Sequence, residues 1–417
     1  MQLLNRIYIK IYLMVLLLYV FFNKGVAYSY MAEMTLVAGI FILFINRKYF
    51  EIALDAKQII VAFFIFISFL FILVGMFRYS LLNVLRDSLA FQYAWFAIII
   101  YFFKNEREFI WGKIIQIYKW VPLVFLLNTF LFYFVFLNLP PINIFGNESI
   151  IIYKNGDKGV HLLISTIVMF LYAHTYSKKW LIINTILITI NLIILFAISR
   201  SGTVSYILAL FSFFIFSKEK ILNDSLIKLL KFVPIIMVVG IGMFIALDIQ
   251  GDSQGRTISL SQITDNFSSI VSSDIDGSLT DNKVWRLVWW AKLVNESFTL
   301  QHFFVGKGLG MSLAGSEIAD PDDNLRSPHN FHLTILARFG YIVFTAWIIW
   351  LASLLKPLFT RKIAGKILAI TSVLFAFIIN GSFDVFFEGP MGAFPFWTFV
   401  GMLFIETTYG SPTETPN

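Results

Sequence analysis

The chain has 417 residues, of which 58% are hydrophobic and only 14% carry a charged side chain. An ordinary soluble domain has roughly 45–50% apolar and about 25% charged residues, so too few polar side chains are present to cover a water-exposed surface. A soluble enzyme, a disordered chain and a fibrous protein are therefore excluded, and the composition predicts a polytopic membrane protein. The absence of cysteine also excludes disulfides, thiolate metal sites and a cysteine nucleophile.

Twelve apolar runs are long enough to cross, or nearly cross, a bilayer. They lie at residues 7–22, 31–45, 59–77, 89–103, 115–137, 160–176, 180–198, 203–217, 230–247, 333–354, 367–380 and 391–406. We expect helices, because a helix satisfies its own backbone hydrogen bonds in lipid. The first run is followed by no small-residue cleavage site, so it is interpreted as a membrane anchor and not as a cleavable signal.

Basic residues indicate which helix ends face the cytoplasm, since cytoplasmic loops carry an excess of lysine and arginine. With the N-terminus inside, 19 of the 32 basic residues fall in inner segments, 6 in short outer loops and 7 within residues 248–338. We therefore predict cytoplasmic termini, transmembrane helices over 1–247 and 332–406, one large outer loop over 248–331 and a polar tail over 407–417. This topology explains the net charge of +7, so no nucleic acid partner is expected.

The outer loop over 248–331 is long enough to be a functional lid. It contains 11 acidic and 6 basic residues, and apolar residues recur at helical spacing over 281–298. Trp285, Trp289 and Trp290 predict that this helix lies at the membrane interface. The run GKGLG at 306–310 is interpreted as a hinge and not as a phosphate cradle, and the acidic run at 320–324 as a solvated turn and not as a calcium site.

Four arginines on the outer side need an explanation, because the sidedness rule disfavours them. Arg200 lies in a hairpin between two apolar runs, Arg286 lies among the tryptophans, and Arg78 and Arg86 flank a short outer loop. A guanidinium at membrane depth is costly unless it is paired, and arginine binds phosphate oxygens through bidentate hydrogen bonds. The four residues are therefore candidate ligands of an anionic substrate, with lipid headgroup contacts or ion pairs to loop carboxylates as the alternatives.

Two of the five histidines lie in the run SPHNFH at 327–332, where the outer loop returns to the membrane. Pro328 favours a helix start, and a spacing of three would place His329 and His332 on one helical face. A neutral histidine at the membrane surface can act as a general base near neutral pH. His161 and His174 are interpreted as packing residues, and no third ligand is spaced for a histidine metal site.

Taken together, these motifs resemble the O-antigen ligase and O-antigen polymerase superfamily of bacterial surface-polysaccharide synthesis. The resemblance covers nearly the whole chain. Its elements are, in order, SRSG at 199–202, Arg286 in a tryptophan-rich helix followed by GKGLG, the run PHNFHL at 328–333 with Leu336 and Gly340 after it, and FDVFFEGP at 383–390. It implies an all-α polytopic membrane fold of the GT-C kind, with about 12 transmembrane helices and one large periplasmic loop.

The resemblance implies a glycosyltransferase that moves a glycan from undecaprenyl diphosphate to an acceptor sugar hydroxyl, on the periplasmic face of the bacterial inner membrane. Arg200 and Arg286 are then expected to stabilise the diphosphate leaving group. His329 is expected to take the proton from the attacking hydroxyl, in an inverting reaction that needs no metal or other cofactor. Further candidates for substrate binding are Arg78, Arg86, Asn330 and His332. Asp384 and Glu388 are expected to pair with an arginine, or else to orient the acceptor.

Two kinds of transferase fit the resemblance. A polymerase joins one lipid-linked repeat to another, whereas a ligase moves the finished glycan to the lipid A core or to a protein. Both use the same donor, and polymerase is preferred because richness in Phe, Ile, Asn and Lys indicates an AT-rich gene, as is common for polysaccharide clusters. A chain-length regulator is a further candidate partner. A lipid-linked oligosaccharide flippase is the alternative from another class, although neither inverted repeats nor matched broken helices are visible.

Overall fold

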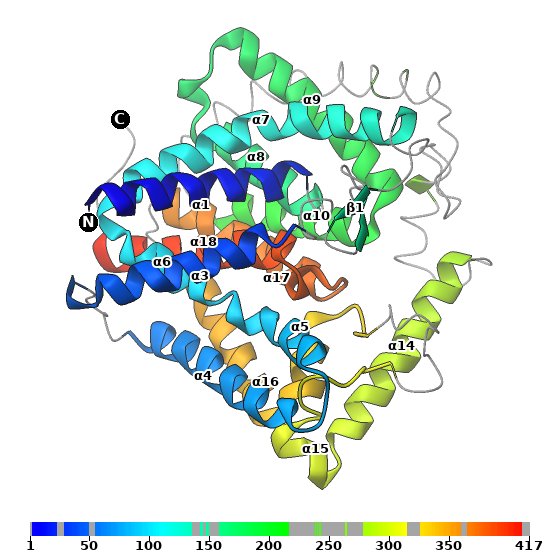
Figure 1. Ribbon diagram of the computed structural model, residues 1–417. Coiled ribbons are helices and arrows are strands. Elements are labelled where there is room, and N and C mark those ends of the chain that lie inside the picture. Colours follow the sequence, from blue (N-terminus) through cyan, green and yellow to red (C-terminus); the bar gives the residue numbers. More distant parts are fainter. Residues whose placement is uncertain are drawn as a thin grey trace.

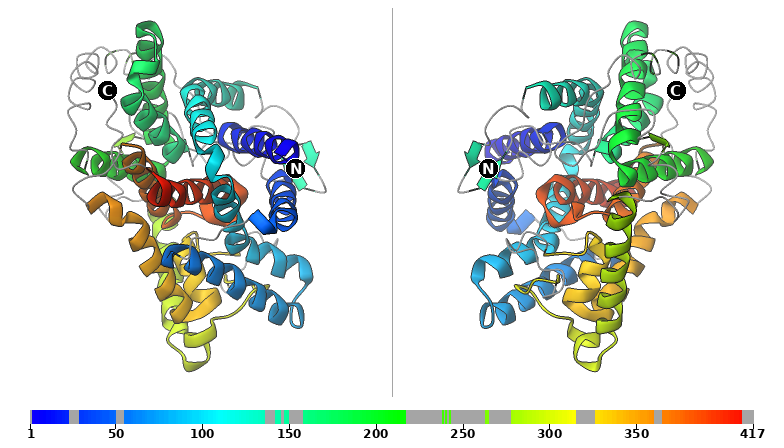
Figure 2. Two further views of the ribbon diagram at one scale, coloured as in Figure 1. Left: turned by 90° about the vertical axis from the view of Figure 1, so that its left-hand side faces the viewer. Right: turned by 90° about the vertical axis from the view of Figure 1, so that its right-hand side faces the viewer.

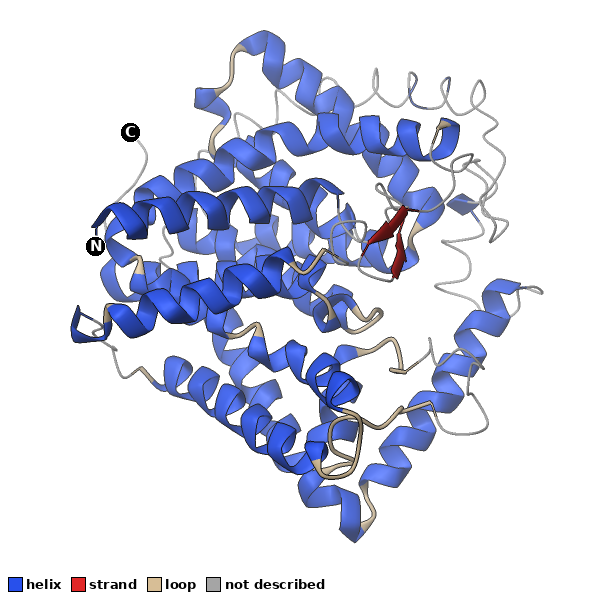
Figure 3. Ribbon diagram, in the orientation of Figure 1, coloured by secondary structure: helices blue, strands red, loops and turns tan. Residues whose placement is uncertain are grey.

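The computed structural model of the chain is almost entirely helical (Figures 1 and 3). It describes residues 2–22, 29–49, 55–135, 142–144, 147–149, 158–216, 238, 240, 242, 263–264, 278–314, 326–359 and 365–410. The α-helices within these ranges are α1 (Gln2–Phe22), α3 (Met31–Ile45), α4 (Ala56–Met76), α5 (Leu81–Gln92), α6 (Trp95–Phe102), α7 (Arg107–Phe134), α8 (Lys158–Leu171), α9 (Lys178–Ile198), α10 (Arg200–Phe216), α14 (Ser278–Ser297), α15 (Leu300–Val305), α16 (Phe331–Leu355), α17 (Gly365–Gly381) and α18 (Pro390–Tyr409).

Short elements connect the helices. The 3-10 turns are η1 (Arg47–Tyr49), η2 (Lys104–Glu106), η4 (Ala173–Thr175), η5 (Lys356–Phe359) and η6 (Phe386–Glu388). Two short strands, β1 (Ile142–Ile144) and β2 (Asn147–Ser149), form an antiparallel ribbon in which Ile142 lies opposite Ser149. The predicted all-α membrane fold is therefore confirmed in its class, with this small ribbon as an addition.

Eleven of the twelve predicted apolar spans coincide with described helices. The span predicted at 89–103 is interrupted, because α5 ends at Gln92 and α6 begins at Trp95. The span predicted at 230–247 falls almost wholly outside the described residues. Within the described part of the chain, five helical segments are long and apolar enough to cross a membrane, beginning at Leu3, Ala56, Lys104, Lys178 and Phe331. Four shorter apolar helices, α3, α8, α10 and α17, accompany them.

The helix α18 lies at the centre of the bundle (Figure 2). Its residues from Pro390 to Glu406 are buried, and it packs against α6, α17 and α1. By contrast, α4 at the periphery exposes Phe66 and Phe69, which are 58% and 53% accessible. Large apolar side chains on an outer helix face are stable when lipid and not water surrounds them. The bundle is thus organised as expected for a membrane protein.

Charged residues gather at two opposite ends of the bundle. At one end, Lys366 lies 3.0 Å from Glu108 and 3.2 Å from Glu406, and Arg107 donates to the carbonyl of Tyr409. We call this the Lys366 end; it joins the starts of α7 and α17 to the end of α18, all of which the charge pattern assigns to the inner side. The other end contains the start of α16, the 382–389 loop and α14, and we call it the His329 end.

Near the His329 end, α16 is broken at Gly340, whose φ of 79° and ψ of −179° are open only to glycine. The break frees two carbonyl groups of the helix. The carbonyl of Ala337 accepts the N–H of Lys307, and that of Arg338 accepts the N–H of Gly308. Because irregular backbone at membrane depth must find hydrogen-bond partners within the protein, the 306–310 segment and the α16 break require each other.

The GKGLG run at 306–310 therefore differs from a free hinge. Gly306, Gly308 and Gly310 all have positive φ, between 61° and 99°. At Gly306, a Cβ atom would lie 2.5 Å from the backbone carbon of Arg338, so only glycine permits this approach. The run is bonded tightly to α16.

The tryptophans of α14 point into the protein. Trp289 is fully buried and donates to the carbonyl of Leu313, and Trp290 donates to the carbonyl of Pro328. Trp285 packs against Trp289 and His329. The position of this helix at the membrane interface stays a prediction; the indole N–H groups of Trp289 and Trp290 bind backbone carbonyls of the outer loop. Figure 1 shows α14 and α15 at the edge of the bundle.

Candidate functional site

His329 lies immediately before α16 and not within it. The helix begins at Phe331, and Asn330 is its N-cap, whose side chain accepts the N–H of Leu333 at 3.1 Å. His329 has a φ of 52°, in the left-handed region that non-glycine residues seldom adopt. The prediction that His329 and His332 share one helical face is therefore wrong, because the chain turns sharply between Pro328 and the cap. Such backbone strain is typical of functional positions.

The ring of His329 is held between two side chains from other segments. Its Nδ1 lies 3.6 Å from Oδ1 of Asp384, which belongs to the loop between α17 and α18. The indole of Trp285 stands edge-on to the ring, with centroids 6.1 Å apart and planes at 88°. The side chain remains 27% exposed. His329 is thus oriented on one side by a carboxylate and on another by an aromatic ring, while part of it stays accessible.

His332 is in contrast fully engaged inside the bundle. Its Nδ1 accepts the indole N–H of Trp347 at 3.0 Å, so the proton of the neutral ring is on Nε2. Nε2 then donates to the carbonyl of Ile378 at 3.2 Å. The candidate role of His332 in substrate binding remains a prediction, and the observed contacts describe a histidine that ties α16 to α17.

Arg286, on α14, lies close to His329 and its neighbours. Its Nη1 donates to the carbonyl of Phe383 at 3.1 Å, and its guanidinium lies over the ring of Trp285, 5.5 Å from the centroid. Trp285 therefore contacts both Arg286 and His329, and the dipeptide Phe383–Asp384 contacts both as well. The structure thus brings together two of the three predicted catalytic residues, which are 43 positions apart in the sequence.

Arg200 is the first residue of α10. Ser199 caps this helix, since its Oγ accepts the N–H of Gly202 at 3.1 Å. The start of α10 crosses the start of α8 closely, because a Cβ on Gly159 would lie 2.5 Å from the carbonyl oxygen of Gly202. One turn further on, Ser205 lies 3.4 Å from Asn380, near the end of α17. Arg200 is therefore at the same end of the bundle as His329.

A cavity of about 280 Å³ opens beside His329. Its charged and titratable lining consists of Arg86, Asp87, Arg326, His329, Arg338 and Glu388. Of the four predicted substrate-binding residues, Arg86 lines the cavity, whereas Arg78, Asn330 and His332 do not. Arg78 lies exposed in the turn before α5. Neither Arg200 nor Arg286 is part of the lining.

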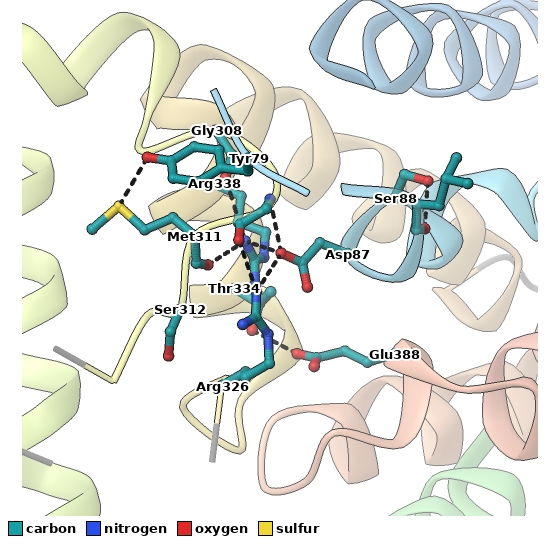
Figure 4. Close-up of polar contacts among 12 residues, drawn as sticks. Tyr79, Asp87, Ser88, Gly308, Met311, Ser312, Arg326, Thr334, Arg338 and Glu388 are labelled. Atoms are coloured by element: carbon teal, nitrogen blue, oxygen red, sulfur yellow. Dashed lines mark hydrogen bonds and ion pairs between the residues drawn. The ribbon is translucent and has the colours of Figure 1, made fainter. Parts of the chain in front are cut away.

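Asp87, on α5, joins two arginines at the cavity wall (Figure 4). Its Oδ2 lies 2.8 Å from Nη1 of Arg338 and 3.4 Å from Nη2 of Arg326, and it accepts the N–H of Gly310 at 2.9 Å. The three charged side chains are between 3% and 9% exposed. One buried carboxylate thus links α5, the 306–314 loop and α16.

Backbone carbonyl groups hold the two guanidiniums in place. Arg338 donates to the carbonyls of Gly308 and Met311, at 3.3 and 3.1 Å, and Arg326 donates to the carbonyl of Gly310 at 2.9 Å. A buried guanidinium needs such partners for its several N–H donors. The charged groups at the cavity are therefore fixed in position by the 308–311 backbone.

Glu388, in η6, also lines the cavity and is drawn below Asp87 in Figure 4. Thr334 donates to its carboxylate at 2.7 Å. Burial raises the pKa of the Glu388 carboxyl, while hydrogen bonds from Ser327 and Thr334 and the charge of Arg338 act in the opposite direction. Asp384 faces His329, and Glu388 accepts a hydrogen bond from a hydroxyl and feels the charge of Arg338, so their pairing with arginine stays a prediction.

The sequence reasoning did not single out Asp87, Arg326 or Arg338 as site residues. One signal was available for Arg338, because it falls inside an apolar span predicted at 333–354, where an ionisable side chain is a functional candidate. Asp87 and Arg326 are separated by more than two hundred positions, and only the fold shows that they meet. Among the described residues, no group of three His, Asp or Glu side chains is arranged to hold a metal ion.

Residues 183–348 match a family model described as O-Antigen ligase. The match supports a relationship of this part of the chain to the O-antigen ligase and polymerase superfamily. The resemblance predicted from the motifs is thereby confirmed, and the matched region contains Arg200, Arg286, His329 and Arg338. Members of the family are glycosyltransferase-like membrane enzymes of polysaccharide synthesis. No curated protein matches the chain.

Proposed function

We propose that the protein transfers a glycan from a polyprenyl diphosphate to a sugar hydroxyl, with undecaprenyl diphosphate as the lipid carrier. The observation that carries this proposal is the placement of His329, which borders an arginine-lined cavity and faces Asp384 within a family that acts in polysaccharide synthesis. A base beside a strongly cationic site suits a reaction in which a hydroxyl attacks and a diphosphate leaves.

In the proposed step, the acceptor hydroxyl oxygen forms a bond to the anomeric carbon of the donor. The bond between that carbon and the diphosphate oxygen breaks, and its electron pair stays on the diphosphate. The hydroxyl proton passes to Nε2 of His329, whose Nδ1 is turned toward Asp384. A carboxylate at this position stabilises the imidazolium that forms. Direct displacement inverts the configuration at the anomeric carbon.

Arg200 and Arg286 are the proposed ligands of the leaving diphosphate. Support comes from Arg286, whose guanidinium is anchored by Phe383 and Trp285 next to His329. Arg200 starts a helix at the same end of the bundle, and the positive end of the helix dipole there also favours an anion. Guanidinium groups fixed in advance can stabilise the charge that develops on the leaving group.

The proposed location of this chemistry is the periplasmic face of the inner membrane. The segments that the charge pattern assigns to the cytoplasm meet at the Lys366 end, and the residues assigned to the outer side meet at the His329 end. The separation of the two groups supports the predicted sidedness. Lipid-linked glycans would then reach His329 from the outer leaflet.

Among the acceptors, we favour a second lipid-linked repeat, which makes the protein a polymerase. A ligase that moves the glycan to the lipid A core is the second candidate, and it would use the same donor residues. A deletion strain distinguishes them on a lipopolysaccharide gel. A single repeat on the core indicates a lost polymerase, whereas a core without any repeat indicates a lost ligase.

The transfer reaction itself is tested with the purified full-length protein, a lipid-linked donor and an acceptor. We expect formation of a glycosidic bond by the wild type and a loss of about 100-fold or more in His329→Ala, since general bases contribute about 10²–10⁴-fold. Arg47→Gln, at the Lys366 end, is the control for expression and purification. Movement of the donor across vesicles without bond formation would show a flippase, and full activity of His329→Ala would remove the general base.

A further inference from the structure

The cavity beside His329 carries more positive than negative groups. Arg86, Arg326 and Arg338 line it, and Asp87 provides one carboxylate for two of these guanidiniums. The second carboxyl of the lining, Glu388, accepts a hydrogen bond from Thr334, so the lining contains three guanidinium groups and two carboxyl groups. A cavity with more guanidinium than carboxyl groups attracts an anion, because Coulomb interactions strengthen where protein partly replaces water.

This cavity is separate from the guanidinium groups proposed to hold the donor diphosphate. Arg286 is fixed to Phe383, and Arg200 lies at the start of α10; neither lines the cavity. His329 borders the cavity and also contacts Trp285, on which Arg286 lies. The histidine is thus situated between two arginine groups that come from different parts of the chain.

We propose that the cavity is an acceptor subsite, in which Arg86, Arg326 and Arg338 bind an anionic group of the acceptor glycan, either a phosphate or a carboxylate. The assignment to the acceptor rests on the proposed transferase function, in which His329 deprotonates the acceptor. A molecule whose hydroxyl reaches His329 from the cavity places its neighbouring groups among these arginines. At about 280 Å³ the cavity is smaller than sites for whole drug-sized ligands, and it therefore holds one part of a glycan.

Asp87 acts in this subsite as a positioning residue. It is bonded to the N–H of Gly310 and faces both Arg326 and Arg338, so it holds the two guanidiniums at a fixed separation (Figure 4). The carbonyls of Gly308, Gly310 and Met311 direct the same two side chains. Donors fixed before the ligand arrives lose little conformational entropy when they bind it.

Anion binding by full-length protein tests the subsite without any need for turnover. The background variant is Arg200→Gln combined with Arg286→Gln, which removes the proposed donor ligands. The probes are inorganic pyrophosphate and glucuronate, with glucose as the neutral comparison, measured by calorimetry in detergent. We expect at least one anion to bind more tightly than glucose, and the tighter of the two indicates whether phosphate or carboxylate is preferred.

Variants at the cavity then locate the binding. In the same background, Arg326→Gln is expected to weaken binding of the preferred anion about tenfold or more. Arg86→Gln, which changes an exposed residue of the lining, should weaken it severalfold while leaving the fold intact. Arg47→Gln at the Lys366 end is the matched control. Two results would overturn the subsite. One is anion binding no tighter than that of glucose, and the other is anion binding by the Arg86 and Arg326 variants as tight as that by the background variant.

The transfer assay separates this inference from the function on which it depends. With Arg200 and Arg286 intact, Arg86→Gln should raise the KM for the acceptor severalfold and leave the KM for the lipid-linked donor unchanged. A wild type that forms no glycosidic bond would contradict the transferase, while the anion measurement would still report on the cavity. Transfer with an unchanged acceptor KM would contradict the acceptor assignment alone.

Discussion

The two ends of the bundle use charged residues in different ways. At the Lys366 end, regular helix ends carry the ion pairs, and Lys366 joins Glu108, which is 67% exposed, to Glu406, which is 7% exposed. At the His329 end, Asp87 and Arg338 are 6% and 3% exposed, and the backbone around them is irregular. An exposed pair contributes little to stability, whereas a buried pair is costly to break. The contrast between Glu108 and Asp87 shows that the charged groups at the cavity are held by buried contacts.

Removal of the Asp87 charge should have the largest effect on stability. Asp87→Asn leaves the guanidinium of Arg338 buried without its carboxylate, which costs about 3–5 kcal/mol. We expect a strongly lowered Tm in detergent, together with loss of the cavity. Glu108→Gln at the opposite end should change stability by about 1 kcal/mol or less, because that carboxylate is exposed. Equal losses in the two variants would show that the two ends do not differ in this way.

The next largest effect on stability is expected from a substitution at the break in α16. Gly340→Ala forces a side chain into a backbone conformation restricted to glycine and places Cβ 2.7 Å from the backbone carbon of Phe304. The strain alone is worth about 1–3 kcal/mol, and thermal unfolding should report a lower Tm.

The same substitution at Gly112, in α7 near the Lys366 end, is the matched control. Nothing lies within 4 Å of a Cβ at that position, so the alanine should stabilise the helix by roughly 0.5–1 kcal/mol. A Tm that changes in the same direction in both variants would contradict the assigned role of the break.

A smaller effect, on the rate of transfer, is expected when the charge of Asp384 beside His329 is removed. Asp384→Asn removes the charge 3.6 Å from Nδ1 that would stabilise the imidazolium. A loss of about 1.4 kcal/mol corresponds to a tenfold lower rate, and we expect this in kcat more than in KM. Asp55→Asn, before α4, is the control, since its side chain caps no helix N–H. Unchanged kcat in Asp384→Asn would remove the carboxylate from the mechanism.

The smallest expected effect is the change in stability caused by Glu388→Gln, and this change depends on pH. Because burial raises its pKa, the folded protein holds this proton more tightly than the unfolded chain does. The stability of the wild type should therefore fall, relative to Glu388→Gln, as the pH rises from the ordinary carboxyl pKa through the raised value. Tm values of the two proteins should agree near pH 4 and diverge toward pH 7, with the variant higher. A wild type that is relatively more stable at pH 7 would reverse this assignment.

The positions of most helices could be predicted, because an apolar run of sufficient length has few other stable structures in lipid. The interruption between α5 and α6 was missed, since Tyr93 and Ala94 are as apolar as their neighbours. The contacts of Trp289 and Trp290 with the carbonyls of Leu313 and Pro328 could not be predicted either. Periodicity shows that a helix has an apolar face, but it does not show whether lipid or protein covers that face.

The sequence by itself determined the membrane class, the predicted sidedness, the family and the candidates His329, Arg200 and Arg286. These follow from local composition and from short motifs, both of which can be recognised directly in the sequence. Only the tertiary structure decided that Asp87 meets Arg338 from 251 positions away, that His329 precedes its helix and that Asp384 faces it. Contacts of this kind depend on how broken helices and loops share their backbone hydrogen bonds, which no local pattern in the sequence specifies.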